Sequence, residues 1–593
     1  MTTPTRWNRS LLYSSEKDPQ IKADLARLAE LSLAFEKYRG TLRAKVSRRS
    51  LAYVKQAFLD YAVIEEIFWK LDGFCDLLGY ELADKVDTFC GKIHNTAYEV
   101  SKSSEFFVAE IAHLGDRWLQ VLINDPRFKE FRNWIIELRD SKDHYLPVNE
   151  SLILTGIKTH LDSLGEKIIQ RDLEETVISA TELGSRKKMH IKGVWELMER
   201  HASRAKRLMA YKALNRSLRA SSPRAALLIN SLGCASETCD DFLKYADPTA
   251  RFCSENQLAR PVFDLVLAKA REHLPLFRAY LKDQKHRLGL THLGFQDIKA
   301  NNMPRRKIPF DQAKQLVIDG YGKCSQVLAT EASRIIRNHQ FYFRTLDHID
   351  SPLVLFGSSG TMPFGYVPFD GSWYQTDSLA HEMGHAINAS LSRARGYYGF
   401  ECNFLIAETM STFGSLLLYD QISERGNAFK EKRTSLWDIL RFVFQKIAHC
   451  QFELDVYARL KKDFAIDEPE LESLWLASHR EVFGNAVSLN QSFGTFWVYG
   501  SVFHTGIYSA PISYTFPYIF SQLVSLWLWN NYHKDGNKRK FVRRYLELNR
   551  AGSVASTAEL LEPFGINLES PEFWDECFVV VKNLLIENGI SVK

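Results

Sequence analysis

The sequence predicts a mostly α-helical protein of several subdomains, with one small β-sheet. Apolar residues recur every three or four positions from Lys22 to about Ile349, as on one face of a helix, and this spacing resumes after Leu405. Between these stretches, residues 351–369 are rich in Gly, Pro and apolar side chains, which is typical of short buried strands. A length of 593 residues also exceeds the roughly 250–300 at which a single core stops growing.

The composition is that of an ordinary globular protein, with 45% hydrophobic residues, 25% charged residues and a net charge of +5. The basic clusters at 186–188 and 538–544 are short, so we interpret them as solvated helix faces rather than as a nucleic-acid-binding arm. The sequence has neither an apolar signal core at its start nor an apolar run of about 18 residues. We therefore expect a cytoplasmic protein with no membrane or nucleic-acid partner.

The nine cysteines are scattered and show no C-x-x-C spacing. This pattern predicts reduced, buried thiols rather than a disulfide framework. A second metal site built on cysteines is not expected.

The most informative motif is the pentapeptide H-E-M-G-H, from His381 to His385, inside the apolar run 378–388. Residues four apart share one face of a helix, so the two histidines can bind the same zinc ion. Glu382 lies beside that face, where its carboxylate can take a proton from a zinc-bound water that attacks a peptide carbonyl. The motif indicates a metallopeptidase with one zinc ion (Zn2+) per chain.

A catalytic zinc site needs a third protein ligand and leaves its fourth position open for water. Glu408 lies in the apolar segment 404–418, where burying a carboxylate is costly unless it is paired or bound to metal. The alternative, Glu401, lies in a more polar turn. On the burial argument we favour Glu408 as the third ligand, with His381 and His385.

A second group of polar residues lies between Gly500 and Phe520, where His and Tyr alternate with Gly and Pro. Such a segment is typical of a loop that closes around a ligand. The oxyanion that forms during peptide hydrolysis needs hydrogen-bond donors opposite the metal. The segment offers the four donors His504, Tyr508, Tyr514 and Tyr518. Taken alone, the segment is more typical of an aromatic core.

These motifs resemble the oligoendopeptidase F branch of the thimet oligopeptidase-like zinc metallopeptidases. The resemblance includes H-E-M-G-H followed by Glu408 in I-A-E-T-M-S-T-F, the opening from Trp7 to Tyr13, and the loop 503–520, so it covers nearly the whole chain. It implies a helical body with a deep substrate channel and a small sheet next to the zinc helix. It also favours the edge of that sheet as a binding site for substrate backbone over a plain buried hairpin.

The resemblance further implies that His504, Tyr514 and Tyr518 stabilise the transition state, with Tyr508 the weaker candidate. It suggests an N-terminal helical region over 1–110, an oligopeptidase F-type helical domain over 111–190 and a zinc metallopeptidase catalytic domain over 191–593. Where members of the branch continue S-T-F-N-E, this chain has S-T-F-G-S at 411–415. We therefore expect a carboxylate near the metal glutamate to be absent.

We expect a zinc-dependent metalloendopeptidase that hydrolyses internal bonds of short oligopeptides. One alternative is a zinc carboxypeptidase-type enzyme that trims ends. Another, from a different class, is a non-catalytic peptide-binding protein with the same fold. The sequence carries no signal for the oligomeric state.

Overall fold

The computed structural model confirms a mostly helical protein with two small sheets. It describes residues 6–42, 48–82, 87–154, 157, 176–179, 188–300, 307–344, 352–423, 429–500, 514–534, 536 and 538–592. Among the described residues, no helix combines the length and the apolar character that a membrane span requires.

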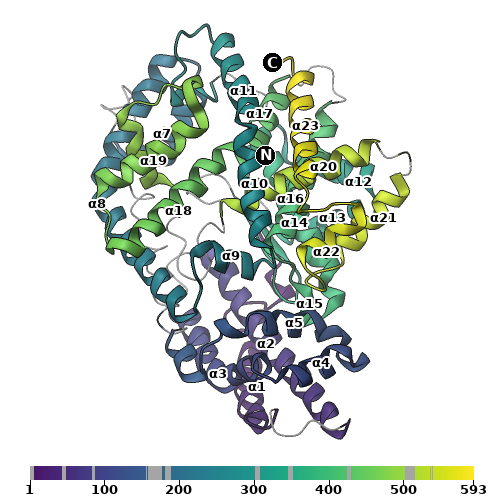
Figure 1. Cartoon of the computed structure of the whole chain (residues 1–593). Coiled ribbons are helices and arrows are strands. Elements are labelled where there is room, and N and C mark those ends of the chain that lie inside the picture. The colour runs from purple at the N-terminus through teal and green to yellow at the C-terminus, as the bar shows by residue number, and fades with distance from the viewer. Residues whose placement is uncertain are drawn as a thin grey trace.

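The N-terminal helices form one end of the molecule around a core of their own (Figure 1). These helices are α1 (Pro19–Phe35), α2 (Arg48–Leu82), α3 (Asp87–Ala112), α4 (Asp116–Asn124) and α5 (Arg132–Asp140). Their core extends to the central sheet, because the indole nitrogen of Trp7 donates a hydrogen bond of 2.7 Å to the carbonyl of Gly365. The Trp7 motif at the start of the sequence thus joins this end of the molecule to the sheet that precedes the H-E-M-G-H helix.

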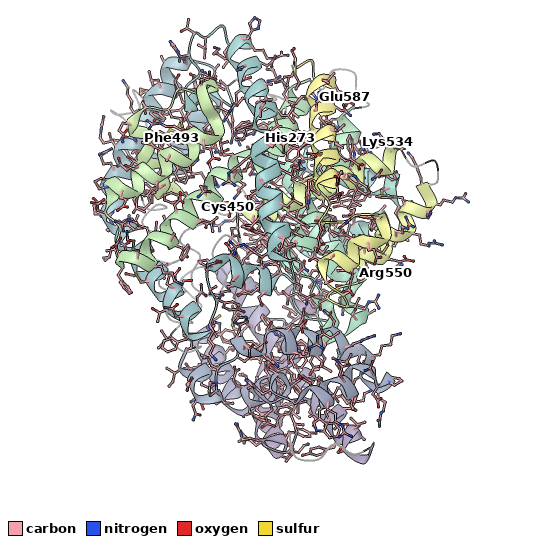
Figure 2. The ribbon with its side chains drawn as sticks, in the orientation of Figure 1. His273, Cys450, Phe493, Lys534, Arg550 and Glu587 are labelled. Carbon is pink, nitrogen blue, oxygen red and sulfur yellow. The ribbon has the colours of Figure 1, made fainter. Side chains whose placement is uncertain are left out.

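A second core lies along one side of the molecule, on the left in Figure 1. It is built by α7 (Ile191–Arg200), α8 (Arg204–Phe242), α18 (Lys446–Asp463), α19 (Glu468–Phe483) and a 3-10 helix, η10 (Gln491–Tyr499). Phe493, labelled in Figure 2, is 1% exposed and belongs to this core.

The third and largest core surrounds the H-E-M-G-H helix. Its helices are α9 (Pro248–Glu255), α10 (Arg260–Glu272), α11 (Leu274–Arg287), α12 (Phe310–Cys324), α13 (Gln326–Arg337), α14 (Trp373–Ser392), α16 (Phe404–Ser423), α17 (Phe429–Leu440), α20 (Phe516–Lys534), α21 (Lys538–Asn549), α22 (Thr557–Leu561) and α23 (Pro571–Glu587). The short helix α15 (Tyr397–Phe400) packs instead on the N-terminal core through Tyr398. Between α17 and α18 the chain makes a π-helical turn, η8 (Arg441–Gln445).

The main sheet has the strand order β3-β5-β4, from β3 (Phe341–Arg344), β4 (Leu353–Leu355) and β5 (Phe364–Pro368). β5 is central, pairing parallel to β3 and antiparallel to β4. A smaller antiparallel sheet joins β1 (Val177–Ile178) to β2 (Met189–His190).

The expectation of helix as far as about Ile349 is wrong for β3. Residues 341–343 are all buried, so the strand lacks the apolar and polar alternation that marks a half-exposed strand.

The helix that carries H-E-M-G-H begins directly after β5. Gly371 has φ +78°, a left-handed conformation that favours glycine, and it turns the chain sharply out of the sheet. The Ser372 side chain then accepts a hydrogen bond of 3.3 Å from the backbone N–H of Gln375 and caps the N-terminus of α14. The sheet thus determines where α14 starts and which face it presents.

Helices α14 and α16 cross with their backbones in direct contact. A Cβ atom on Gly384 would lie 2.6 Å from the Cα atom of Ser411 and 2.7 Å from the carbonyl oxygen of Met410. On its other side α16 is held by α20, where the hydroxyls of Ser521 and Ser525 each donate a hydrogen bond of 2.9 Å to a carbonyl of α16. The glycine of H-E-M-G-H is therefore needed for the close approach of the two helices.

We predict that Gly384→Ala lowers the free energy of unfolding by roughly 1–3 kcal/mol, because the methyl group forces the two backbones apart. The melting temperature should fall accordingly. The same substitution should weaken metal binding, which depends on both helices. Differential scanning fluorimetry and metal analysis measure the two effects. Gly73→Ala in α2 is the matched control, because a Cβ atom there meets nothing within 4 Å and should be neutral or stabilising. Wild-type melting and metal content in Gly384→Ala would contradict the packing argument.

Candidate metal centre and active site

Helices α14 and α16 bring His381, His385 and Glu408 together. The Nε2 atoms of His381 and His385 lie 3.3 Å and 3.7 Å from the two carboxylate oxygens of Glu408. One ligand atom from each of the three residues lies within 4.8 Å of the others. The two histidines are adjacent on one helix face, with their rings 5.1 Å apart.

These distances fit a zinc ion. With bonds of about 2.0–2.2 Å, the ligand atoms of a tetrahedral zinc lie roughly 3.3 Å from one another. Two imidazole nitrogens and one carboxylate are also a donor set that zinc prefers, with one position left for water. The three side chains are therefore spaced as ligands of one ion.

Glu408 is 3% exposed, and several donors surround its carboxylate. Ser411 donates a hydrogen bond of 3.2 Å from its hydroxyl to Glu408 Oε2, and the carboxylate is near enough to Tyr518 to add to the rise that burial causes in the pKa of that phenol. Burial raises the pKa of Glu408, but His385 and the hydrogen bond from His381 outweigh it and lower the pKa. Glu408 is therefore held as a carboxylate, the form that binds metal.

The two histidines differ in their surroundings. Burial lowers the pKa of His381, but its hydrogen bond to Glu408 and the nearby carboxylates raise the pKa to about 9. Burial lowers the pKa of His385 to about 4, so this imidazole is neutral and free to bind metal through Nε2. The ring of His385 packs edge-on against Phe356, 5.6 Å away, and its Nδ1 has no hydrogen-bond partner among the described residues.

Glu382 is 5% exposed and follows His381 directly on the helix. Burial is the main cause that raises its pKa to about 7, with Glu408 adding to the shift and His381 opposing it. A carboxylate with this pKa can both take and return a proton near neutral pH. It has the properties expected of a general base.

Glu401, the alternative third ligand, does not join the cluster. It is exposed in the segment between α15 and α16 and lines a different pocket, with Phe356 and Asn388. The group of possible metal ligands in this part of the structure contains Glu408 and not Glu401.

The predicted transition-state donors are only partly described. Tyr518 is near the cluster, because Glu408 and Glu382 both add to the rise that burial causes in its pKa. Tyr514 precedes α20, is 37% exposed and packs against Phe404 with ring centroids 6.0 Å apart. His504 and Tyr508 lie outside the described residues.

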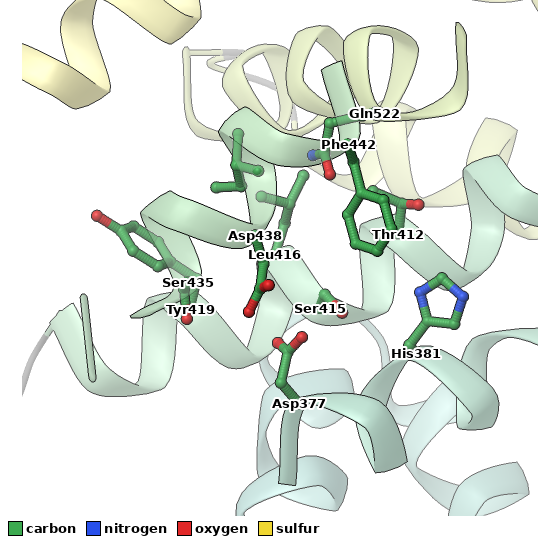
Figure 3. Close-up of a pocket in the computed structure, with 11 residues that line it drawn as sticks. Asp377, His381, Thr412, Ser415, Leu416, Tyr419, Ser435, Asp438, Phe442 and Gln522 are labelled. Atoms are coloured by element: carbon green, nitrogen blue, oxygen red, sulfur yellow. The ribbon is translucent and has the colours of Figure 1, made fainter. Parts of the chain in front are cut away.

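A pocket beside His381 holds two further acids, shown in Figure 3. The carboxyl groups of Asp377, one turn before His381, and Asp438, on α17, point toward each other, with Ser415 close by. Burial raises the pKa of Asp377 to about 7, and Asp438 adds to the rise. Ser415 occupies the position where members of the oligoendopeptidase F branch have a glutamate, and it lines the same pocket as Asp377. Carboxylates from other helices thus occupy this region.

The sequence argument did not identify Asp377, Asp438, Arg441 or Lys446 as neighbours of the site. Arg441 Nε pairs with Asp438 Oδ1 at 2.6 Å, and Lys446 Nζ lies 4.8 Å from the centre of the Tyr518 ring. For Asp377 a signal was present, because it is a carboxylate four residues before His381 in an apolar helix. For the other three, no local signal links α17 and α18 to the metal helix.

The geometry defines a candidate metallopeptidase centre, and the comparisons with known proteins agree. Residues 366–580, which contain all three candidate ligands, match the model of peptidase family M3. The chain is 20% identical over 493 residues to oligopeptidase PepF of Bacillus subtilis, which covers 81% of this chain and 72% of that protein. It is 23% identical over 346 residues to an oligoendopeptidase F homolog of Lactococcus lactis, covering 56% and 55% of the two chains.

The fold agrees as well. The crystal structure of oligoendopeptidase-F from Enterococcus faecium matches with a TM-score of 0.69 at 16% identity, over 96% of this chain and 98% of that chain. These matches confirm the resemblance to oligoendopeptidase F. They also confirm the predicted class, a metallopeptidase that acts on oligopeptides.

We predict that Glu408→Gln lowers zinc affinity, by about 10-fold or more, because the neutral amide is a much poorer ligand than the carboxylate. Metal content after dialysis against a chelator measures the effect. Glu401→Gln is the matched control and should retain wild-type zinc content. Loss of metal in Glu401→Gln rather than Glu408→Gln would reverse the assignment of the third ligand.

Proposed function

We propose that this protein is a zinc-dependent endopeptidase that cuts internal bonds of short oligopeptides. The observation that carries the proposal is the cluster of His381, His385 and Glu408 within 4.8 Å, with the buried Glu382 beside it. His381, His385 and Glu408 would hold one zinc ion. Bound there, zinc would supply a Lewis acid that polarises the substrate carbonyl and makes a water molecule more acidic.

Glu382 acts as the general base. Its carboxylate takes the proton of the attacking water and later passes a proton to the leaving amine, so it changes protonation state twice in each cycle. Burial supports this role, because it raises the pKa of Glu382 to about 7 and makes both transfers favourable near neutral pH. Asp438, by contrast, is paired with Arg441 and is not available as a base.

His504, Tyr514 and Tyr518 stabilise the developing oxyanion by donating hydrogen bonds. The position of Tyr518 beside Glu408 supports this assignment, because it places one phenol next to the metal ligands. Its burial and the neighbouring carboxylates raise the pKa of Tyr518 well above the usual value, so it remains a donor at any physiological pH.

The edge of the main sheet is the proposed track for the substrate backbone. β4 pairs only with β5 among the described strands, which leaves its other edge available for an extended peptide. The residue after β4, Phe356, contacts His385, so this edge runs toward the metal cluster. Recognition through backbone hydrogen bonds suits internal cleavage of varied sequences. The names of the relatives, oligopeptidase and oligoendopeptidase, support the same substrate class.

We predict that Glu382→Gln retains zinc but loses about 10²–10⁴-fold in kcat, because the amide keeps the shape of the side chain without its basicity. The substrate is a quenched peptide acetylated at its N-terminus and amidated at its C-terminus, and mass spectrometry locates the cut. Wild-type cleavage of this doubly blocked peptide indicates internal cutting, whereas an enzyme that trims free ends leaves it intact. More than about a tenth of wild-type kcat in Glu382→Gln would exclude Glu382 as the base.

The donor residues give a separate prediction. Tyr514→Phe and His504→Ala should fold and bind zinc, yet lose about 10²–10³-fold in kcat with little change in KM, because these donors act mainly in the transition state. Steady-state kinetics on the blocked peptide measures both constants. Tyr508→Phe is the control and should be close to wild type. Impairment of Tyr508→Phe alone would pass the donor role to that residue.

A further inference from the structure

The junction between the π-helical turn η8 and helix α18 places a lysine next to the candidate active site. The Nζ atom of Lys446 lies 4.8 Å from the centre of the Tyr518 ring and donates a hydrogen bond of 2.9 Å to the carbonyl of Tyr514. Phe442 stacks on the Tyr518 ring, with centroids 5.3 Å apart and planes at 17°. The Tyr518 ring therefore contacts both a phenyl ring and an ammonium group, and burial together with the nearby carboxylate of Glu408 raises the pKa of its hydroxyl.

Lys446 differs from its neighbour Arg441 in having no counter-charge in contact, because the carboxylates that raise its pKa, Glu453 and Glu408, form no ion pair with it. Arg441 is neutralised by Asp438, with a distance of 2.6 Å between the charged groups. For Lys446, no carboxylate of the described residues lies within 4.0 Å of Nζ. The segment 501–513, which precedes Tyr514, contains no Asp or Glu in its sequence.

A half-buried ammonium without a counter-charge is costly, because burial removes water without replacing it by an anion. Burial and the nearby Arg441 lower the pKa of Lys446 to about 8, so the group still carries a proton at neutral pH. Among the described residues, one of its three N–H donors is used, by the carbonyl of Tyr514. Two donors and one positive charge are thus available to a ligand that lies along Tyr514 and Tyr518.

We propose that Lys446 binds a carboxylate of the peptide substrate. This inference rests on the proposed peptidase function and adds a preference to it. A carboxylate matches all three properties of the lysine, because it supplies the missing charge, accepts the two spare N–H groups and is present in peptides. The carboxylate can come from an acidic side chain or from the C-terminus of the peptide. Both sources share the same chemistry, and the test separates them.

The test uses four quenched peptides of one sequence, whose cleavage site is first located by mass spectrometry. They combine Asp or Asn at a position near the cut with a free or an amidated C-terminus. Kinetics are measured with the zinc-loaded wild type, Lys446→Met and Lys446→Arg. Lys462→Met is the matched control, because it removes the same charge from an exposed position on the same helix.

The wild type should prefer a peptide that carries a carboxylate. Lys446→Met should raise KM for that peptide about 10- to 100-fold, as expected for the loss of one charged hydrogen bond. The kcat for that peptide, and both constants for the peptides without a carboxylate, should be nearly unchanged. Lys446→Arg should restore part of the preference, and Lys462→Met should match the wild type. A preference for Asp over Asn identifies a side chain as the source, and a preference for the free over the amidated end identifies the C-terminus.

A purely structural role for Lys446, in which it only supports the chain at Tyr514, would affect all four peptides equally. That result, or unchanged KM values in Lys446→Met, would overturn the proposal. Fluorescence anisotropy with labelled peptides in the Glu382→Gln background measures binding independently of turnover. In this background, Lys446→Met should weaken the binding of only those peptides that carry a carboxylate. Lys446→Gln replaces Lys446→Met if the latter fails to fold. If the wild type cleaves none of the peptides, the proposed peptidase function fails, and the anisotropy measurement still decides the role of Lys446.

Discussion

The close crossing of α14 and α16 is the constraint on which the rest of the site depends. The histidines belong to one helix and Glu408 to the other, so their separation is determined by how near the two backbones can come. Gly384 permits contact between backbones, and two serines of α20 hold α16 from its far side. Three packed helices, rather than flexible loops, therefore define the ligand spacing. Sites built on such elements are held more accurately than sites on loops.

The same packing concentrates charge in a small buried volume. The histidines compensate Glu408 and hold its pKa below the ordinary value, and Asp438 is paired with Arg441 at 2.6 Å. Glu382 and Asp377 receive less compensation, and burial raises the pKa of each to about 7. Helix packing thus produces, in neighbouring positions, carboxylates suited to binding a cation and a carboxylate suited to moving a proton. The difference lies in which of them has a basic partner.

Much of the fold and of the metal cluster could be predicted from the sequence, because the signals were local. H-E-M-G-H places two histidines on one helix face, and the apolar surroundings of Glu408 marked it as a buried acid that needs a partner. β3 was missed because a strand buried on both faces has no alternation to distinguish it from a helix.

The carboxylate pair and Lys446 were missed for another reason. Asp377 and Asp438 come from helices far apart in sequence, and their relation follows from tertiary packing alone. The lack of a counter-charge at Lys446 is likewise visible only when the neighbours of its ammonium group are known. His504 and Tyr508 lie outside the described residues, so their roles stay predictions.

The π-helical turn η8 determines the direction in which the ammonium group of Lys446 points. Over five residues an α-helix rotates by about 500°, which would direct Arg441 and Lys446 roughly 140° apart. Here the N–H of Lys446 bonds to the carbonyl of Arg441, five residues back, and this wider turn carries Lys446 round toward the tyrosines. A π turn is an α-helix with one residue inserted. If the same residues formed a regular α-helix instead, the ammonium group would be rotated away from Tyr518, so the polarity of the site depends on this wider turn as well as on its side chains.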